Sequence, residues 1–326
     1  MTPTLSSARR GALCIALLWW LVPACADDVA PGPAEVEARL SDEDRQRLAR
    51  AEDLMRTQLH EQVRPLLQPL LERQPVPVDA QYLAGQAAYY MGEYGEAATR
   101  LADVLARHRD VYLTRSNALG FAHYKLGDFA ASRDVFSAIT TADPSAHKAH
   151  YGLAQVALTE GLYEEARSHV ETALSLAPDY LKARFALARV LDGLGEFEAA
   201  LQVAESLGQA WPSNEELLYL QSQLLHRLDR PEDARAVELR RAMVYDIKQR
   251  VGDALGRIRA GEDSPLLRIT IIDGFLQLGD LREAIGHLNT ARTRWPDDPV
   301  LAQTAERLQA QLSAGAGAGA ESTSDA

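Results

Sequence analysis

Three histidines, His123, His147 and His150, are the residues whose type and spacing could hold a metal ion. His147 and His150 lie three residues apart, so on a helix they would share one face. Three imidazoles close together can bind zinc. His123 and His150 also fall at positions where helices pack together, and we adopt this packing interpretation, with a zinc site as the alternative. The sequence therefore predicts neither a metal site nor a bound cofactor.

The rest of the sequence contains no motif for catalysis. It has no HExxH or CxxC motif, no GxSxG nucleophile elbow and no glycine-rich phosphate loop after a strand. Neighbouring carboxylates such as Glu164 and Glu165 are typical of solvated helix faces. We therefore predict a protein that is not an enzyme and has no catalytic residue.

The first residues have the pattern of an export signal. Arg9 and Arg10 precede an apolar stretch from 11 to 22, which is shorter than the roughly 20 residues needed to span a bilayer. Small residues follow it, as at a signal-peptidase site. We predict a signal peptide over residues 1–26 and a flexible linker rich in Pro, Gly and acidic residues over 27–43.

Two cleavage sites are compatible with this segment. Val22-Pro23-Ala24-Cys25 resembles a bacterial lipobox, which would place a lipid such as palmitate on Cys25. With Ala26 after the cysteine, the resemblance implies a lipoprotein at the periplasmic side of the outer membrane. Plain cleavage after Ala26 would instead give a secreted or soluble periplasmic protein. Cys14 is removed either way, so no disulfide within the mature chain is expected.

The charge of the chain excludes some partners. The formal net charge is −12, and removal of Arg9 and Arg10 makes the mature chain more acidic. Non-specific binding to nucleic acid needs clustered Lys and Arg that neutralise phosphates. We therefore predict no nucleic-acid partner and no polybasic membrane patch.

The stretch 147–214 contains two copies of one pattern, thirty-four residues apart. Alanines recur where two antiparallel helices would cross, glycines where the first helix would end, and prolines where the second would stop. The coinciding pairs are Leu153 and Leu187, Ala154 and Ala188, Gly161 and Gly195, Tyr163 and Phe197, Ala166 and Ala200, and Pro178 and Pro212. This period and these anchors resemble the tetratricopeptide repeat, a helix–turn–helix unit of about 34 residues.

The resemblance implies an all-α solenoid in which helix pairs stack into a right-handed superhelix. The predicted solenoid extends over residues 44–312, and a disordered tail is expected at 313–326. We expect repeats at 44–77, 78–111, 113–146, 147–180, 181–214, 215–248 and 265–298, and a closing helix at 299–312. Apolar residues at spacings of three and four predict one long helix from 231 to about 260, broken at Gly252 or Gly256.

In this family the first helix of each repeat lines a concave groove, with positions two, five, nine and twelve pointing inward. Aromatic rings, amides and cations occupy these positions here, which suits recognition of a peptide; packing of the rings between neighbouring helices is the alternative. The predicted groove residues are Tyr82, Gln86, Tyr89, Asn117, Phe121, Tyr124, Lys148, Tyr151, Gln155, Lys182, Phe185, Arg189, Tyr219, Gln223 and His226.

The charges at these positions indicate which kind of peptide the groove would bind. The family's carboxylate clamp for a peptide C-terminus is incomplete, because Asn117 occupies one of its places and the matching lysine is absent. Lys148, Lys182 and Arg189 nevertheless make the centre of the groove more basic than the chain as a whole. An acidic ligand segment is therefore expected.

Together these features predict a non-catalytic protein–protein interaction scaffold in the bacterial cell envelope. It would bind a protein or peptide partner in the concave groove and assist assembly of an envelope complex. The alternatives are an accessory or regulatory subunit of a cell-wall enzyme, and an adaptor that self-assembles through the long helix. The sequence does not indicate the oligomeric state.

Overall fold

The computed structural model describes residues 40–321, with side chains for 40–310, and this part of the chain consists of helices joined by short turns. It contains 16 α-helices, two short 3-10 helices and no strand, so the all-α solenoid prediction is confirmed for this range. None of the described helices combines the length and apolar character needed to cross a bilayer. Cys25 and the predicted signal peptide lie outside the described residues.

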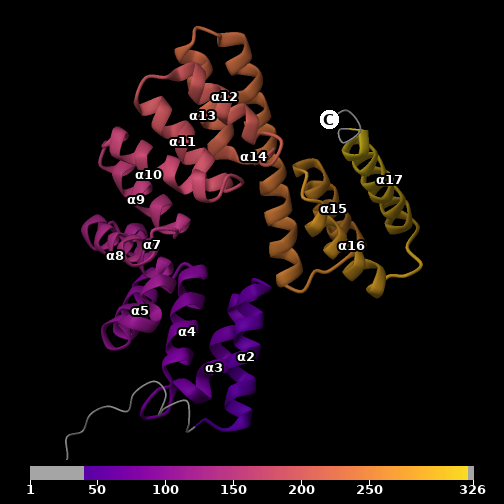
Figure 1. Cartoon of the computed structure of the whole chain (residues 1–326). Coiled ribbons are helices and arrows are strands. Elements are labelled where there is room, and N and C mark those ends of the chain that lie inside the picture. Colours follow the sequence, from indigo (N-terminus) through magenta and orange to yellow (C-terminus); the bar gives the residue numbers. More distant parts are fainter. Residues whose placement is uncertain (1–39, 322–326) are drawn as a thin grey trace, which may run out of the picture.

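The helices follow one another as a curved stack (Figure 1). They are α2 (Asp42–Arg56), η1 (His60–Gln62), α3 (Val63–Leu71), α4 (Val78–Tyr90), α5 (Tyr94–Arg107), α6 (Arg109–Tyr112), η2 (Leu113–Arg115), α7 (Asn117–Lys125), α8 (Phe129–Ala142), α9 (His147–Thr159), α10 (Tyr163–Leu176), α11 (Leu181–Gly193), α12 (Phe197–Leu207), α13 (Glu215–Arg227), α14 (Pro231–Arg259), α15 (Pro265–Leu278), α16 (Leu281–Arg294) and α17 (Pro299–Glu321).

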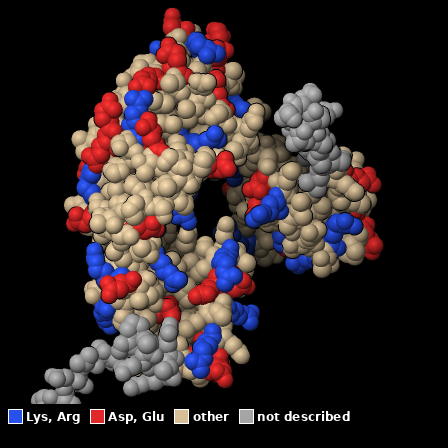
Figure 2. Space-filling model, viewed as in Figure 1, with Lys and Arg blue, Asp and Glu red and all other residues tan. Residues whose placement is uncertain are grey.

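Each helix packs mainly against the helices next to it in sequence. Alanines lie at the crossings, and Ala154, Ala166, Ala188 and Ala200 are all completely buried. Small side chains allow the two helix backbones to approach, and the larger apolar residues then fill the space between successive pairs. The space-filling view shows an opening at the centre of the curved stack, with basic side chains along its left and lower edges (Figure 2).

Glycines end the first helix of most pairs, as the sequence predicts. Gly161 and Gly195 have φ values of 76° and 80°, and Gly92, Gly127 and Gly279 lie in the same left-handed region. Glycine adopts this region without the steric cost that a Cβ brings. In the turn between α13 and α14 the residue is Asp229, with φ 56°. Its short polar side chain makes it one of the few residues that tolerate this conformation.

Phe136 on α8 joins two repeats. Its side chain is completely buried and its ring lies between the backbones of Gly120 on α7 and Gly152 on α9. A Cβ at either glycine would collide with this ring. Tyr163 occupies the same kind of place against Gly193 on the following helix. Glycine is therefore required inside these helices for close packing, at the expense of helix propensity.

The first repeat is closed by a buried carboxylate. Ser41 and Asp44 form a capping box at the start of α2, which begins at Asp42, within the predicted linker. Arg73, just after α3, donates two hydrogen bonds of 2.7 Å to the Asp44 carboxylate, which lowers its pKa to about 2. These bonds hold α2 against the end of α3, where Pro69 lies inside the helix.

The long helix predicted from 231 to about 260 is present as α14, and it is continuous through Gly252 and Gly256. Its first half packs on α13, and its second half packs on α15. Asp263 follows it and accepts hydrogen bonds from Arg268 and Arg294, each of 2.8–2.9 Å. These bonds lower the Asp263 pKa and tie α14 to the α15–α16 pair.

The final helix departs from the sequence prediction. α17 begins at Pro299 and continues to Glu321, past the predicted end at 312 and into the segment 313–326 that was expected to be disordered. Alanine has the highest helix propensity of all residues, and alanines alternate with the glycines of this segment. The Gly, Ala, Ser and acidic composition that suggested disorder does not by itself prevent a helix from extending.

Gly152→Ala should lower the free energy of unfolding by about 1–3 kcal/mol, because overpacking against Phe136 outweighs the gain in helix propensity. Gly252→Ala is the matched control on α14, where nothing lies within 4 Å of an added Cβ. It should raise stability by about 0.5–1 kcal/mol. Urea unfolding followed by circular dichroism measures both. Equal effects of the two substitutions would contradict the packing role of Gly152.

Candidate protein-binding groove

A cavity of about 460 Å³ lies between α11 and α13. Four of the predicted groove residues line it, namely Phe185, Arg189, Tyr219 and Gln223. The sequence prediction did not include the other lining residues, which are Leu158, Tyr163, Asp192, Gly193, Glu216 and Leu220. Phe185 and Arg189 lie four residues apart on α11, so one face of this helix forms one wall.

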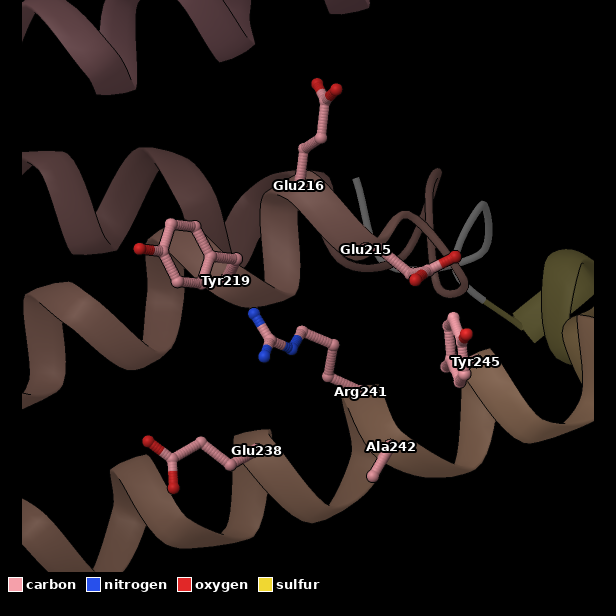
Figure 3. Close-up of a pocket in the computed structure, with 7 residues that line it drawn as sticks. All are labelled: Glu215, Glu216, Tyr219, Glu238, Arg241, Ala242 and Tyr245. Atoms are coloured by element: carbon pink, nitrogen blue, oxygen red, sulfur yellow. The ribbon is translucent and has the colours of Figure 1, made fainter.

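A second cavity, of about 510 Å³, lies between α13 and α14 (Figure 3). Its lining residues are Glu215, Glu216, Tyr219, Glu238, Arg241, Ala242 and Tyr245. Glu216 and Tyr219 belong to both cavities, so the Tyr219 side chain stands between them. Figure 3 shows the Arg241 side chain extending from α14 toward the Tyr219 ring.

Tyr219 is the ring of the predicted set that is most open to solvent, with 48% of its surface exposed. Its hydroxyl accepts a 2.6 Å hydrogen bond from Gln223 Nε2, and the Arg241 guanidinium lies 5.0 Å from its ring centroid. These contacts orient the ring while one side of it stays accessible. A rigid, exposed ring offers contact area to a partner at low entropic cost.

Tyr82, in contrast, is part of the packed interior. Only 8% of its surface is exposed, and its hydroxyl donates to the Arg115 carbonyl at 3.0 Å and accepts from Gln86 Nε2 at 2.8 Å. Its ring packs on Tyr112, with centroids 4.8 Å apart. At this position the structure supports the packing alternative.

Several of the other predicted rings form contacts from one repeat to the next. Phe121 packs on Tyr151 with centroids 5.8 Å apart, and Tyr151 packs edge-on against Tyr180 at 5.2 Å. The Tyr124 hydroxyl hydrogen-bonds with Thr159 at 2.9 Å. These side chains are half-buried, so they stabilise the curved stack and still show part of their surface to the groove.

The predicted groove residues therefore divide by exposure. Tyr82 and Gln155 are buried; Gln86, Tyr89, Asn117, Phe121, Tyr124, Tyr151, Phe185 and Gln223 are half-buried; Lys148, Lys182, Arg189, Tyr219 and His226 are exposed. Asn117 Oδ1 is buried and has no hydrogen-bond partner among the described residues. The exposed members come from α9, α11 and α13, which places the accessible part of the groove toward the second half of the stack.

The three histidines considered for zinc each contact a different residue. His123 is next to Asp128, His147 packs edge-on against Tyr180, and His150 Nε2 lies 3.1 Å from the Pro144 carbonyl. Within residues 40–310 no group of three or more His, Cys, Asp or Glu side chains has the arrangement of a metal site. Each of the three side chains thus makes a separate contact, and His150 Nδ1 is buried without a hydrogen-bond partner among the described residues.

Comparison with known families agrees with this architecture. A tetratricopeptide repeat profile matches residues 48–110 and 117–180, and a second tetratricopeptide repeat profile matches 157–224. Together the matched residues make up more than half of the chain, and the protein belongs to the tetratricopeptide repeat family. Proteins of this family are generally non-catalytic scaffolds with protein partners. No curated protein is significantly similar to the chain.

Solved structures with similar repeats include three from different bacteria. A tetratricopeptide repeat protein from Parabacteroides merdae is 13% identical, with 82% of this chain and 100% of that chain covered and a TM-score of 0.48. MamA from Desulfovibrio magneticus is 19% identical, with 52% and 95% covered and a TM-score of 0.45. TTC0263 from Thermus thermophilus is 22% identical, with 60% and 99% covered and a TM-score of 0.37. These identities are too low to indicate a function.

Burial raises the pKa of Tyr82, Tyr89 and Tyr151 to about 12, and also raises that of Tyr180. Because the unfolded value is near 10, the folded state keeps protons that the unfolded state loses. Stability from these groups is complete below pH 10 and is lost as the pH rises from about 10 to 12.

Tyr151→Phe should therefore leave the urea midpoint at pH 7 nearly unchanged and make its decline between pH 10 and 12 shallower. Tyr245→Phe, at a side chain that is 56% exposed, is the matched control. Parallel declines for the parent protein and Tyr151→Phe would show that ionisation of Tyr151 is not linked to unfolding.

Proposed function

We propose that the protein is a scaffold that binds a segment of a partner protein across the two cavities bordered by α11, α13 and α14. The observation that carries the proposal is Tyr219, an exposed ring held between two cavities of about 460 and 510 Å³. Phe185 and Tyr163 supply apolar walls, and Gln223 and Arg189 supply hydrogen-bond donors. This combination of rings with a few polar groups is typical of protein-recognition sites.

The solenoid would contribute by presenting these side chains in one geometry. The rings of successive repeats support one another, and Phe185 itself packs against Trp211 with centroids 6.3 Å apart. A pre-organised site loses less conformational entropy when the partner binds. The mechanism proposed is therefore recognition alone, with no chemical step.

Tyr219→Ala should weaken partner binding by about tenfold or more, since truncation of a central ring at an interface typically has this effect. The measurement is capture of envelope proteins on the immobilised protein, followed by titration of each captured protein. Leu266→Ala, which truncates an apolar side chain that is 73% exposed on α15, is the control. Circular dichroism should show the same helix content for all three proteins.

The groove proposal requires that a partner bind the parent protein and the Leu266→Ala control and be lost with Tyr219→Ala. Partners that bind all three proteins with equal affinity would place the interaction elsewhere on the solenoid. The identity of a groove-dependent partner would then name the process that the scaffold serves.

We further propose that the scaffold works in the bacterial cell envelope, anchored by lipid on Cys25 to the outer membrane, and assists assembly of an envelope complex. The support is the order of Arg9-Arg10, the apolar stretch and Val22-Pro23-Ala24-Cys25 in the sequence. A lipid on Cys25 would tether the solenoid to the membrane through the linker at 27–43.

The anchor can be tested by growing cells with radiolabelled palmitate. The parent protein should carry the label and sediment with membranes, whereas Cys25→Ser should carry none and appear in the soluble periplasmic fraction. Cys14→Ser is the matched control and should behave as the parent. A soluble, unlabelled parent protein would contradict the lipid anchor and favour plain cleavage after Ala26.

A further inference from the structure

We propose that the partner segment is acidic and crosses Tyr219, so that its carboxylates pair with Arg189 in one cavity and with Arg241 in the other. This inference rests on the proposed function, since it assigns the chemistry of the segment that the groove binds. It places Arg241, a residue of the second helix of its pair, in a site that the sequence had assigned to first helices alone.

Arg189 provides the first cation. It lines the α11–α13 cavity, and its side chain is exposed. Its contact within the described residues is a 3.4 Å hydrogen bond from Nη1 to Gln155 Oε1, and no described carboxylate pairs with it. Lys182 lies two turns earlier on the same face of α11, exposed and without an ion pair among the described residues. α11 therefore carries two cations without described ion pairs on the face that includes Arg189.

Arg241 provides the second cation. Its guanidinium stacks on the Tyr219 ring at 5.0 Å and forms neither a hydrogen bond nor an ion pair with any residue of the described range. Stacking fixes the plane of a guanidinium and leaves the N–H groups along its edge free. That geometry suits two parallel hydrogen bonds to a carboxylate. The site thus holds an arginine that is oriented but has no acceptor within the described structure.

Most of the carboxylates around the two cavities already have a hydrogen-bond or ion-pair partner. Glu215 accepts a 2.8 Å hydrogen bond from Lys248, Asp192 pairs with Arg227, and Glu238 hydrogen-bonds with His226 at 2.9 Å. Glu216 has no ion pair among the described residues, and its carboxylate points away from Arg241 (Figure 3). Of these four, only Glu216 and Glu238 lack a Lys or Arg partner.

The lining of the two cavities thus includes two cations without ion pairs in the described range, Arg189 and Arg241, beside Glu216 and Glu238. Two more cations without described ion pairs lie outside the cavities: Lys182 on the Arg189 face of α11, and Lys148 on the Tyr151 face of α9. Along α9, α11, α13 and α14 these four cations outnumber the two carboxylates that lack a described Lys or Arg partner, on a chain whose formal net charge is −12. An acidic segment would be repelled by most of the surface and attracted to this part of the groove. Such a contrast gives orientation and selectivity to binding.

The probe for this proposal is a short fluorescein-labelled peptide in which glutamate alternates with leucine and phenylalanine, amidated at its C-terminus. The amide removes the terminal carboxylate, so that binding reports side-chain carboxylates. Two further peptides carry glutamine or lysine in place of every glutamate. Fluorescence anisotropy with the purified protein gives the Kd of each peptide at low and at high salt.

We expect the glutamate peptide to bind at least about tenfold more tightly than the glutamine peptide, and the lysine peptide to bind most weakly. Arg189→Gln and Arg241→Gln should each weaken binding of the glutamate peptide by about tenfold, as expected for loss of one charge-assisted hydrogen-bonding partner. Arg250→Gln is the matched control, because it removes the same charge from the opposite face of α14. High salt should weaken the glutamate peptide alone.

Equal binding of the glutamate and glutamine peptides, or tighter binding of the lysine peptide, would overturn the proposal. An effect of Arg250→Gln as large as that of Arg241→Gln would also overturn it. The affinity for the glutamate peptide would then depend on the net charge of the protein and not on the place of the arginine. If no peptide binds while a captured protein still depends on Tyr219, the acidic-segment inference fails and the proposed scaffold function stands. If captured proteins are also independent of Tyr219, both fail.

Discussion

Every helix pair in this solenoid depends on the next pair to bury its apolar face. A single helix–turn–helix unit leaves one apolar stripe open to water, and stacking of a neighbour removes it. Phe136 illustrates the dependence, because its ring reaches its fully buried position only between Gly120 of its own pair and Gly152 of the following one. The stability of each repeat therefore depends on its neighbours. The angle at which successive helix pairs pack sets the curvature of the stack.

The same dependence determines which rings of the inner face can meet a partner. Between α4 and α10 the predicted groove rings are buried or half-buried, as Tyr151 is between Phe121 and Tyr180, so none of them is as open to solvent as Tyr219. From α11 onward the stack changes because α14 is long enough to pack on α13 and on α15. Tyr219 then has cavities on both sides. Accessibility in the groove thus arises where the regular repeat is interrupted.

Cations without ion pairs in the described structure lie around the two cavities, although the chain as a whole is acidic. The chain is acidic overall, and many of its carboxylates pair with arginines of the same helix or of a neighbouring repeat, as Glu196 before α12 does with Arg167 on α10. Exposed pairs of this kind contribute little stability individually. Their effect here is to leave Lys182, Arg189 and Arg241 as cations without described ion pairs around the cavities, so the groove differs electrostatically from the outer surface.

The sequence by itself determined the repeat, because a period of thirty-four residues with recurring alanine, glycine and proline has few structural solutions, and the positive φ of Gly161 and Gly195 follows from that pattern. It also indicated Phe185, Arg189, Tyr219 and Gln223 as inward-facing residues. Only the tertiary structure decided that Tyr82 is buried while Tyr219 is exposed, since both occupy the same repeat position and differ in what the neighbouring helices place against them. Arg241 was missed for the same reason. It belongs to a second helix, and its approach to Tyr219 depends on the path of α14, which no local pattern specifies.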